Sequence, residues 1–349
     1  MKPKQLLILG IILLILILGV CVKEIQTPPE LTEDVYASLK LDLDPASVLQ
    51  IEIQKRKAEN SLKILRGNDG WRIPALWNAR ADGKKIQEFL VKVAALKGEL
   101  RTGDAALLED FGIRDEEAYK IYFKDGQGAV KQTLLAGIKR PGPESVFLRR
   151  QDSADVFLAD TDLFSEIGIY GDPAAKEPPA DFWADLNLVP FPSAEIEGIQ
   201  IIRFDGGKET VAAHITRVSG GDWKFADTAV AETLDPVKVQ EYLASLSSWR
   251  AQKVLDPAGT NYGLDKATWK MNLQLAGGKT VTLVRGAEDA VTKDFFMQIS
   301  GEPVIFLASQ YYLEEIDAAN DRFFKSTDAR GTEHGKNKQE EVSSPSQNS

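Results

Sequence analysis

The chain has almost no residues of the kinds that bind metals or act as nucleophiles. It contains one cysteine, Cys21, and two histidines, His214 and His334. A single cysteine forms no disulfide within the chain, and two distant histidines argue against a histidine metal cage or a Ser-His-Asp set. The sequence therefore predicts no metal site and no cofactor, and we expect a protein that is not an enzyme.

Basic residues are also in short supply. Lys and Arg number 42 against 52 Asp and Glu, which gives a net charge of −10. A phosphate backbone is repelled by such a chain, so nucleic acid is not an expected partner. The hydrophobic content of 43% and the length of 349 residues indicate a folded body of about two domains.

One long apolar run is present, and it lies at the N-terminus. It extends from Leu6 to Val22 without a charge, and as a helix it would be about 26 Å long, enough to cross a bilayer core. A cleavage site with small residues is poorly formed before Cys21. We predict an uncleaved transmembrane anchor over residues 1–24, with lipid attachment at Cys21 as the alternative.

The charges around this run predict its orientation. Lys2 and Lys4 precede it, whereas Glu24, Glu30 and Glu33 follow it. The positive-inside rule places the N-terminus in the cytoplasm and the body in the periplasm or otherwise outside the cytoplasm. We therefore expect a single-pass protein of the inner (cytoplasmic) membrane.

An amphipathic helix is predicted twice. Asp82 stands at an N-cap position before apolar residues spaced at the helical period up to Leu96. Asp235, followed by Pro236, opens the same pattern up to Trp249, with an offset of 153 (235 − 82). Flanking apolar positions recur with offsets between 147 and 153, which indicates an internal duplication.

Each copy predicts strands, then the helix, then further strands and a short helix. Short turns between strands favour antiparallel pairing. We expect an α+β fold of two tandem homologous units, each a mainly antiparallel sheet with one long amphipathic helix on a face. The predicted boundaries are an anchor over 1–24, a spacer over 25–36, a first unit over 37–170, a linker over 171–181, a second unit over 182–326 and a disordered polar tail over 327–349.

Several short motifs follow one another in a fixed order along the first unit. They are Gly70-Trp71-x-Ile73-Pro74, Ala81-Asp82, Phe111-Gly112-Ile113, Gly137-Ile138, Val146-Phe147-Leu148-Arg149 and Val156-Phe157-Leu158. This order resembles the domain of unknown function family 4340, with the second unit as a weaker copy. The resemblance implies a membrane-anchored bacterial protein, often encoded beside ABC transporter components of the gliding-motility auxiliary type, and it implies no chemistry.

Few side chains suggest catalysis or ion binding. His214 lies in an alternating segment, so a position on a strand face is favoured over a catalytic role. The acidic cluster Asp152, Asp155, Asp160 and Asp162 lacks the spacing of a calcium loop, and a solvated loop is favoured. A carboxylate pair for glycan hydrolysis stays open, because such pairs are set by space and not by sequence spacing.

Differences between the two copies give the candidate interaction residues. Trp77 has no counterpart in the second copy; it either anchors a partner or covers the end of the helix. Arg140, with Arg149 and Arg150 on the returning strand, forms a basic hairpin where the second copy is acidic. That patch predicts a partner surface, and an ordinary solvated hairpin is the alternative.

The leading hypothesis is a non-catalytic accessory protein that works with ABC transporter subunits or auxiliary membrane proteins. The alternatives are an envelope glycan-binding module and a carboxylate-dependent envelope hydrolase.

Overall fold

The computed structural model describes residues 39, 41–56, 61–218 and 220–325. The predicted anchor (1–24), spacer (25–36) and tail (327–349) lie outside these residues. In the part of the chain that is described, no helix is both long and apolar enough to cross a membrane.

The chain divides into two compact units. The first comprises Met1–Leu186, Gln252–Thr260 and Glu302–Leu307, and the second comprises Asn187–Ala251, Asn261–Gly301 and Ala308–Ser349. The boundary between the two units in the middle of the chain falls between Leu186 and Asn187.

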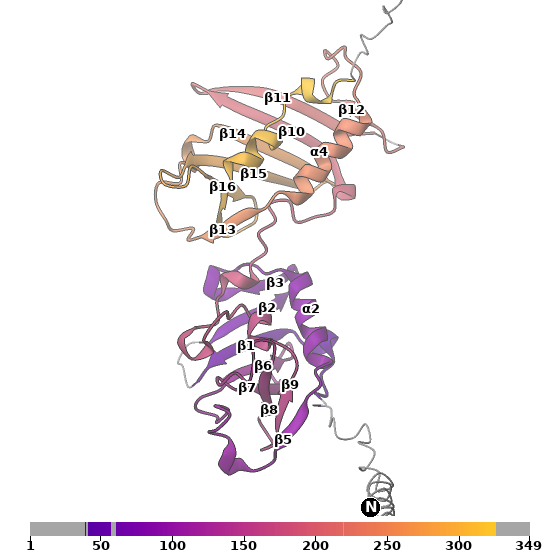
Figure 1. Cartoon of the computed structure of the whole chain (residues 1–349). Coiled ribbons are helices and arrows are strands. Elements are labelled where there is room, and N and C mark those ends of the chain that lie inside the picture. Colours follow the sequence, from indigo (N-terminus) through magenta and orange to yellow (C-terminus); the bar gives the residue numbers. More distant parts are fainter. Residues whose placement is uncertain (1–38, 40, 57–60, 219, 326–349) are drawn as a thin grey trace, which may run out of the picture. The chain divides into compact units, whose positions relative to one another are not determined.

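The first sheet has nine strands in the order β4-β3-β2-β1-β6-β7-β8-β9-β5 (Figure 1). All of its pairings are antiparallel, as the short turns predict. The strands are β1 (Gln50–Lys55), β2 (Leu62–Gly67), β3 (Gly70–Ile73), β4 (Ala79–Arg80), β5 (Glu99–Thr102), β6 (Tyr119–Lys124), β7 (Val130–Ala136), β8 (Val146–Arg150) and β9 (Val156–Ala159).

The second sheet has eight strands in the order β12-β11-β10-β14-β15-β16-β17-β13. Apart from β4, this is the strand order of the first sheet, position for position. Its strands are β10 (Ile196–Asp205), β11 (Lys208–Arg217), β12 (Trp223–Phe225), β13 (Ala251–Leu255), β14 (Trp269–Leu275), β15 (Thr280–Glu288), β16 (Phe295–Ile299) and β17 (Ile305–Ala308).

The two long helices form where the sequence predicts them. Helix α2 (Gly83–Ala94) begins after Asp82, whose carboxylate accepts hydrogen bonds from two backbone N–H groups of the first turn. Helix α4 (Pro236–Ser248) begins after Asp235, whose carboxylate accepts one hydrogen bond, from the Val237 N–H. Two shorter helices, α3 (Leu163–Glu166) and α5 (Gln310–Ile316), follow the last strands.

Each long helix covers one face of a sheet. Ile86, Phe89, Leu90 and Val93 of α2 are buried, and the Phe89 ring lies 6.2 Å from that of Phe123 in β6. Trp249, directly after α4, packs edge-on against Trp269 of β14 at 6.2 Å. Figure 1 shows α4 running across the second sheet. The coarse fold is thus the predicted one, antiparallel sheets with helices packed on a face.

A short aromatic segment follows α3 and α5 and packs against each long helix. Trp183 is fully buried against Phe89 at 5.4 Å, and its carbonyl accepts a hydrogen bond from the Asp82 N–H. Phe323 is fully buried against Tyr242 at 5.2 Å, and its carbonyl accepts one from the Asp235 N–H. These segments are the 3₁₀ turns η6 (Asp181–Trp183) and η9 (Asn320–Phe323).

Residues 171–181, whose composition predicts a linker, lie against the first unit. The Tyr119 hydroxyl is within hydrogen-bond distance of the carbonyls of Pro173 and Lys176, at 2.9 and 2.5 Å. Lys55 pairs with Glu177 at 3.1 Å. This segment therefore belongs to the first unit.

Candidate functional site

Trp77 lies in a turn whose backbone is unusual for its residues. The 3₁₀ turn η3 (Pro74–Leu76) follows β3, and both Trp77 (φ 49°) and Asn78 (φ 61°) then adopt positive φ before β4 begins. Asparagine tolerates this region, whereas tryptophan is rare there, and such conformations occur often at functional sites. The Trp77 side chain is 40% exposed.

A different tryptophan covers the start of α2. Trp71 is nearly buried, and a Cβ placed on Gly83 at the helix start would be 3.6 Å from its ring. Trp71 therefore covers the start of α2. Trp77, whose alternative role was to cover this helix end, is not required for it. Trp77 is left as an exposed aromatic on a constrained turn.

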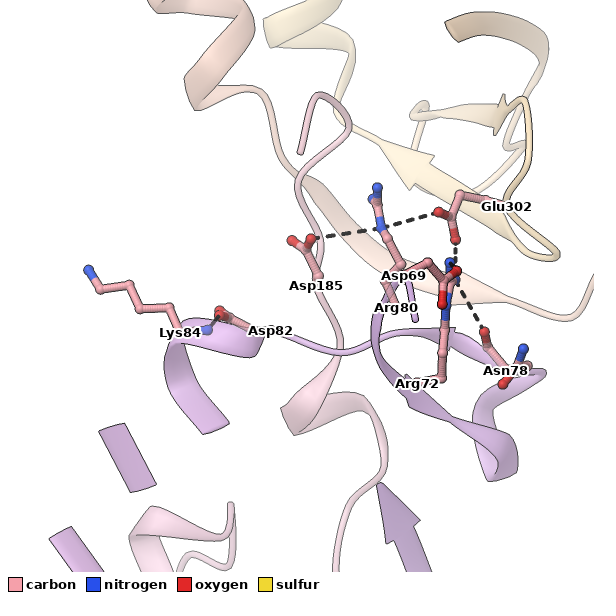
Figure 2. A network of polar contacts seen from close by, with 8 residues as sticks. All are labelled: Asp69, Arg72, Asn78, Arg80, Asp82, Lys84, Asp185 and Glu302. Atoms are coloured by element: carbon pink, nitrogen blue, oxygen red, sulfur yellow. Dashed lines mark hydrogen bonds and ion pairs between the residues drawn. The ribbon is translucent and has the colours of Figure 1, made fainter. Parts of the chain in front are cut away.

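Charged side chains surround this turn (Figure 2). Arg72 donates to Glu302 at 2.8 Å and to the Asn78 carbonyl at 3.5 Å, and Arg80 lies 3.4 Å from Glu302 and 3.8 Å from Asp185. All of these residues belong to the first unit.

The ion pairs in this cluster neutralise one another. Burial disfavours the charged form of Arg72, but Asp69 and Glu302 outweigh that effect and raise its pKa above the ordinary value. The Glu302 side chain is only 9% exposed. The cluster reaches the Trp77–Asn78 turn through the Arg72 contact with the Asn78 carbonyl, and its paired charges make it poorly suited to capture an ionic ligand.

The basic hairpin is largely neutralised by the chain itself. Arg140 pairs with Asp162, the N-cap of α3, and its guanidinium lies 5.6 Å from the centre of the Phe164 ring. Lys139 donates to the Glu109 carbonyl at 2.8 Å. The hairpin thus resembles an ordinary solvated turn more than the open cationic patch that the sequence suggests.

Arg149 is a structural residue. It is 5% exposed, and its guanidinium donates to the carbonyls of Ile113 at 3.1 Å and Ser153 at 3.2 Å and pairs with Asp115. The expectation that this side chain belongs to a partner surface is corrected by this burial.

Arg150, the next residue, points the other way and is partly exposed. It lies 3.6 Å from Asp152 and borders a shallow groove of about 660 Å³ at the end of α2. The groove has apolar walls with charges of both signs and so presents no single chemistry. It is lined by Leu39, Leu41, Asp42, Ala94, Ala95, Leu96, Lys97 and Arg150.

Two members of the acidic cluster near residue 155 act as counter-ions, and one of them, Asp162, also caps α3. Asp152 and Asp162 pair with Arg150 and Arg140 as described. Within the described ranges, no group of three or more His, Cys, Asp or Glu side chains is arranged to hold a metal ion. His214 lies half-buried on β11, opposite Gln200 of β10, on a strand face as its alternating segment predicts.

The sequence interpretation missed the groups that hold the Trp77 turn. Glu302 is far from Arg72 in sequence, and Asp185 lies in a segment that looks like the start of the second unit. The positive φ values of Trp77 and Asn78 could not be predicted from the sequence either. Of the two residue types, only asparagine commonly adopts a positive φ.

A comparison with protein families identifies the chain. The model of the family described as Domain of unknown function (DUF4340) matches residues 71–267. The match is one continuous region, so it does not by itself separate two copies. Neither a curated protein nor a solved structure matches the chain. Because the family model covers more than half of the sequence, the protein belongs to the DUF4340 family.

Proposed function

We propose that this protein is a membrane-anchored accessory protein that works with an ABC-type transporter and has no catalytic activity of its own. The apolar run from Leu6 to Val22 supports the anchor, and the charges around it support a body outside the cytoplasm. The resemblance described above supports the transporter setting.

The exposed Trp77 is the observation that supports a partner surface most directly. Tryptophan is enriched among the residues that dominate binding energy, and this one is presented on a constrained turn. A solvent-exposed tryptophan in a strained conformation is an arrangement that a purely structural turn would not need. We therefore place the contact with the transporter at this turn.

We also infer that the two units derive from one duplicated sequence. Their sheets share a strand order, both long helices are capped by aspartate, and Trp183 and Phe323 make equivalent contacts. Under this inference, shared residues maintain the fold, and Trp77, which is present in one copy only, is free to carry a function.

Affinity purification of the full-length protein from mild detergent tests the proposal. We expect membrane subunits of an ABC transporter to co-purify with the wild-type chain and to be reduced at least tenfold with Trp77→Ala. Leu107→Ala is the matched control, since Leu107 is an equally exposed apolar residue, 40%, of the first unit. It should leave co-purification unchanged.

Two results would contradict the proposal. The first is the absence of any membrane partner from the wild-type preparation. The second is a reporter enzyme fused after Ser349 that is active only in the cytoplasm, because it would reverse the proposed topology.

A further inference from the structure

Two arginines lie on either side of Trp269 in the second unit. Arg203 of β10 lies opposite Trp269 of β14, and Trp269 lies opposite Arg285 of β15. Residues that lie opposite each other in neighbouring strands point to the same face of a sheet. Trp269 is fully buried on the face that α4 covers, so both arginines are on that side. The row therefore places two cations beside a buried indole.

One carboxylate serves this row. Asp317, the residue directly after α5, accepts from Arg203 Nε and from the Trp269 indole N–H, each at 3.0 Å. The Arg203 guanidinium also donates to the Asp317 carbonyl at 3.2 Å. Asp317 is thus the counter-ion of Arg203, and among the described residues Arg285 forms no ion pair.

Neutral groups hold the Arg285 guanidinium in place. Its Nε and Nη2 both donate to the Thr268 hydroxyl, at 3.2 and 2.8 Å, and the guanidinium lies 5.1 Å from the centre of the Phe295 ring. These contacts occupy one edge of the guanidinium. In the part of the chain that the structure describes, Nη1 and the second N–H of Nη2 have no hydrogen-bond partner. A fixed edge with two parallel N–H donors is left over.

The protein does not compensate the charge of Arg285. Partial burial lowers the pKa of this side chain; attraction by Asp317 opposes that effect, and repulsion by Arg203 adds to it. An arginine stays protonated in spite of such a shift, so the row keeps a net positive charge. Burying a charge without a counter-ion is costly. An anion from outside the chain would offset this cost.

The fold does not require the second cation. In the first sheet the same row is formed by Lys55, Tyr119 and Ala136. Lys55 is paired with Glu177 at 3.1 Å, and Ala136 is fully buried. That row has one cation and one carboxylate, whereas the row in the second sheet has two cations and one carboxylate. Arg285 is therefore a feature of the second unit alone.

We propose that Arg285 binds the carboxylate group of a small ligand. Two parallel N–H donors of a guanidinium match the two oxygens of a carboxylate. The single net positive charge of the row suits a singly charged group, whereas a phosphate would bring more negative charge next to Asp317. Arg203, whose side chain is 45% exposed, adds to the attraction. This binding does not depend on the association with a transporter.

Fluorine NMR of the full-length chain in a non-ionic detergent tests the proposal. The probe is fluoroacetate, whose fluorine signal broadens when the probe exchanges on and off a large particle. Chloride keeps the ionic strength constant throughout. We expect the wild-type chain to broaden the signal saturably, and we expect an excess of acetate to sharpen it again.

Substitutions at Arg285 separate the guanidinium edge from the charge. Arg285→Gln should raise the dissociation constant about tenfold or more, because hydrogen bonds between charged groups are the strong ones. Arg285→Lys keeps the charge and the aliphatic stem, and it should raise the dissociation constant severalfold, since an ammonium lacks two parallel donors. Arg101→Gln, at a partly exposed arginine of the first unit, is the matched control and should bind like the wild type. Thermal unfolding of each variant checks that the fold is retained.

Asp317→Asn should change the affinity in the opposite direction. It removes a negative charge beside Arg285, while the side-chain oxygen of asparagine can still accept from the Trp269 N–H. We expect binding severalfold tighter than in the wild type. Damage to the fold would weaken binding, so a gain in affinity distinguishes attraction by charge from a structural effect.

Three results would overturn the proposal. The first is no saturable broadening by the wild-type chain, and the second is equal broadening by Arg285→Gln. The third is displacement of the probe by inorganic phosphate at concentrations at which acetate has no effect, which would assign the site to phosphate.

Discussion

At the scale of single residues, Arg149 and Arg150 are neighbours in β8 with opposite surroundings. Arg149 is buried and donates to backbone carbonyls from two different loops, whereas Arg150 lies at the surface near Asp152. Burial of an arginine is costly unless its donors are satisfied. The two side chains therefore contribute differently to stability.

Replacing Arg149 by alanine should lower the free energy of unfolding by about 2–3 kcal/mol, because buried carbonyls lose their donors. Arg150→Ala should change it by less than about 0.5 kcal/mol, as is usual for exposed residues. Urea denaturation of both variants measures the difference. Equal stability of the two variants would show that the Arg149 contacts are not structural.

Trp77 combines exposure with a conformation that tryptophan rarely adopts. A glycine at this position accepts a positive φ without steric cost, although it loses backbone entropy on folding. We expect Trp77→Gly to remain within about 1 kcal/mol of the wild type in unfolding free energy while co-purification of the partner is lost. A large loss of stability would instead indicate that Trp77 is needed for the fold.

Two buried tyrosines predict sensitivity to high pH. Burial raises the pKa of Tyr119, with Glu177 adding to the effect, and burial also raises the pKa of Tyr242. The unfolded chain ionises these groups near pH 10, before the folded chain does. The stabilisation is therefore complete below about pH 10 and is lost as the pH rises above it.

The slope of this loss is a measurable quantity. Each tyrosine should contribute up to about 1.4 kcal/mol per pH unit above pH 10. Tyr242→Phe should reduce the slope, and Tyr311→Phe, at an exposed tyrosine of α5, should keep it. Urea denaturation at about pH 9, 10 and 11 gives the slopes, and a Tyr242→Phe slope equal to the wild type would refute the assignment.

At the scale of elements, a close backbone approach after β7 explains one of the family motifs. A Cβ on Gly137 would lie 2.5 Å from the Phe111 carbonyl oxygen, and one on Gly286 would lie 2.1 Å from that of Tyr262. In both sheets, the loop that precedes β6 or β14 packs on the end of the next strand, β7 or β15. The glycine is required because no side chain fits between these two backbone segments.

Gly137→Ala should lower the free energy of unfolding by about 1–3 kcal/mol, because a backbone carbonyl cannot move aside as a flexible side chain can. Gly67→Ala is the control: its Cβ would lie 3.4 Å from the Asp69 side chain and 3.8 Å from the Gly70 carbonyl oxygen, both ordinary contact distances. Thermal unfolding of both variants measures this difference in stability. A Gly137→Ala protein as stable as the control would show that the loop can shift.

Elements with a local signal could be predicted from the sequence, and those fixed by distant contacts could not. Asp82 and Asp235 cap helices whose apolar period is visible in sequence. Strands β5 and β13 have no such pattern, because they lie at a sheet edge and β5 is held by β9 far along the chain. The packing of Trp183 and Phe323 could not be predicted from the sequence, because the residues they contact lie on the long helices, far away along the chain.

At the scale of the whole molecule, comparison of the two units gave the candidate interaction residues. It selected Trp77, which is exposed on a constrained turn, but it also selected Arg149, which is buried. The sequence could not show that Trp77 is exposed and Arg149 buried, because Asp115, which pairs with Arg149, is distant from it in sequence.

Site-specific photocrosslinking in membranes tests the central proposal most directly. A photoreactive phenylalanine analogue is placed at position 77 of the full-length chain, and at position 107 in a control. The proposal predicts a crosslink from position 77 to a membrane subunit of an ABC transporter and none from position 107. Absence of that adduct from position 77, with the protein present in the membrane, would contradict the proposed function.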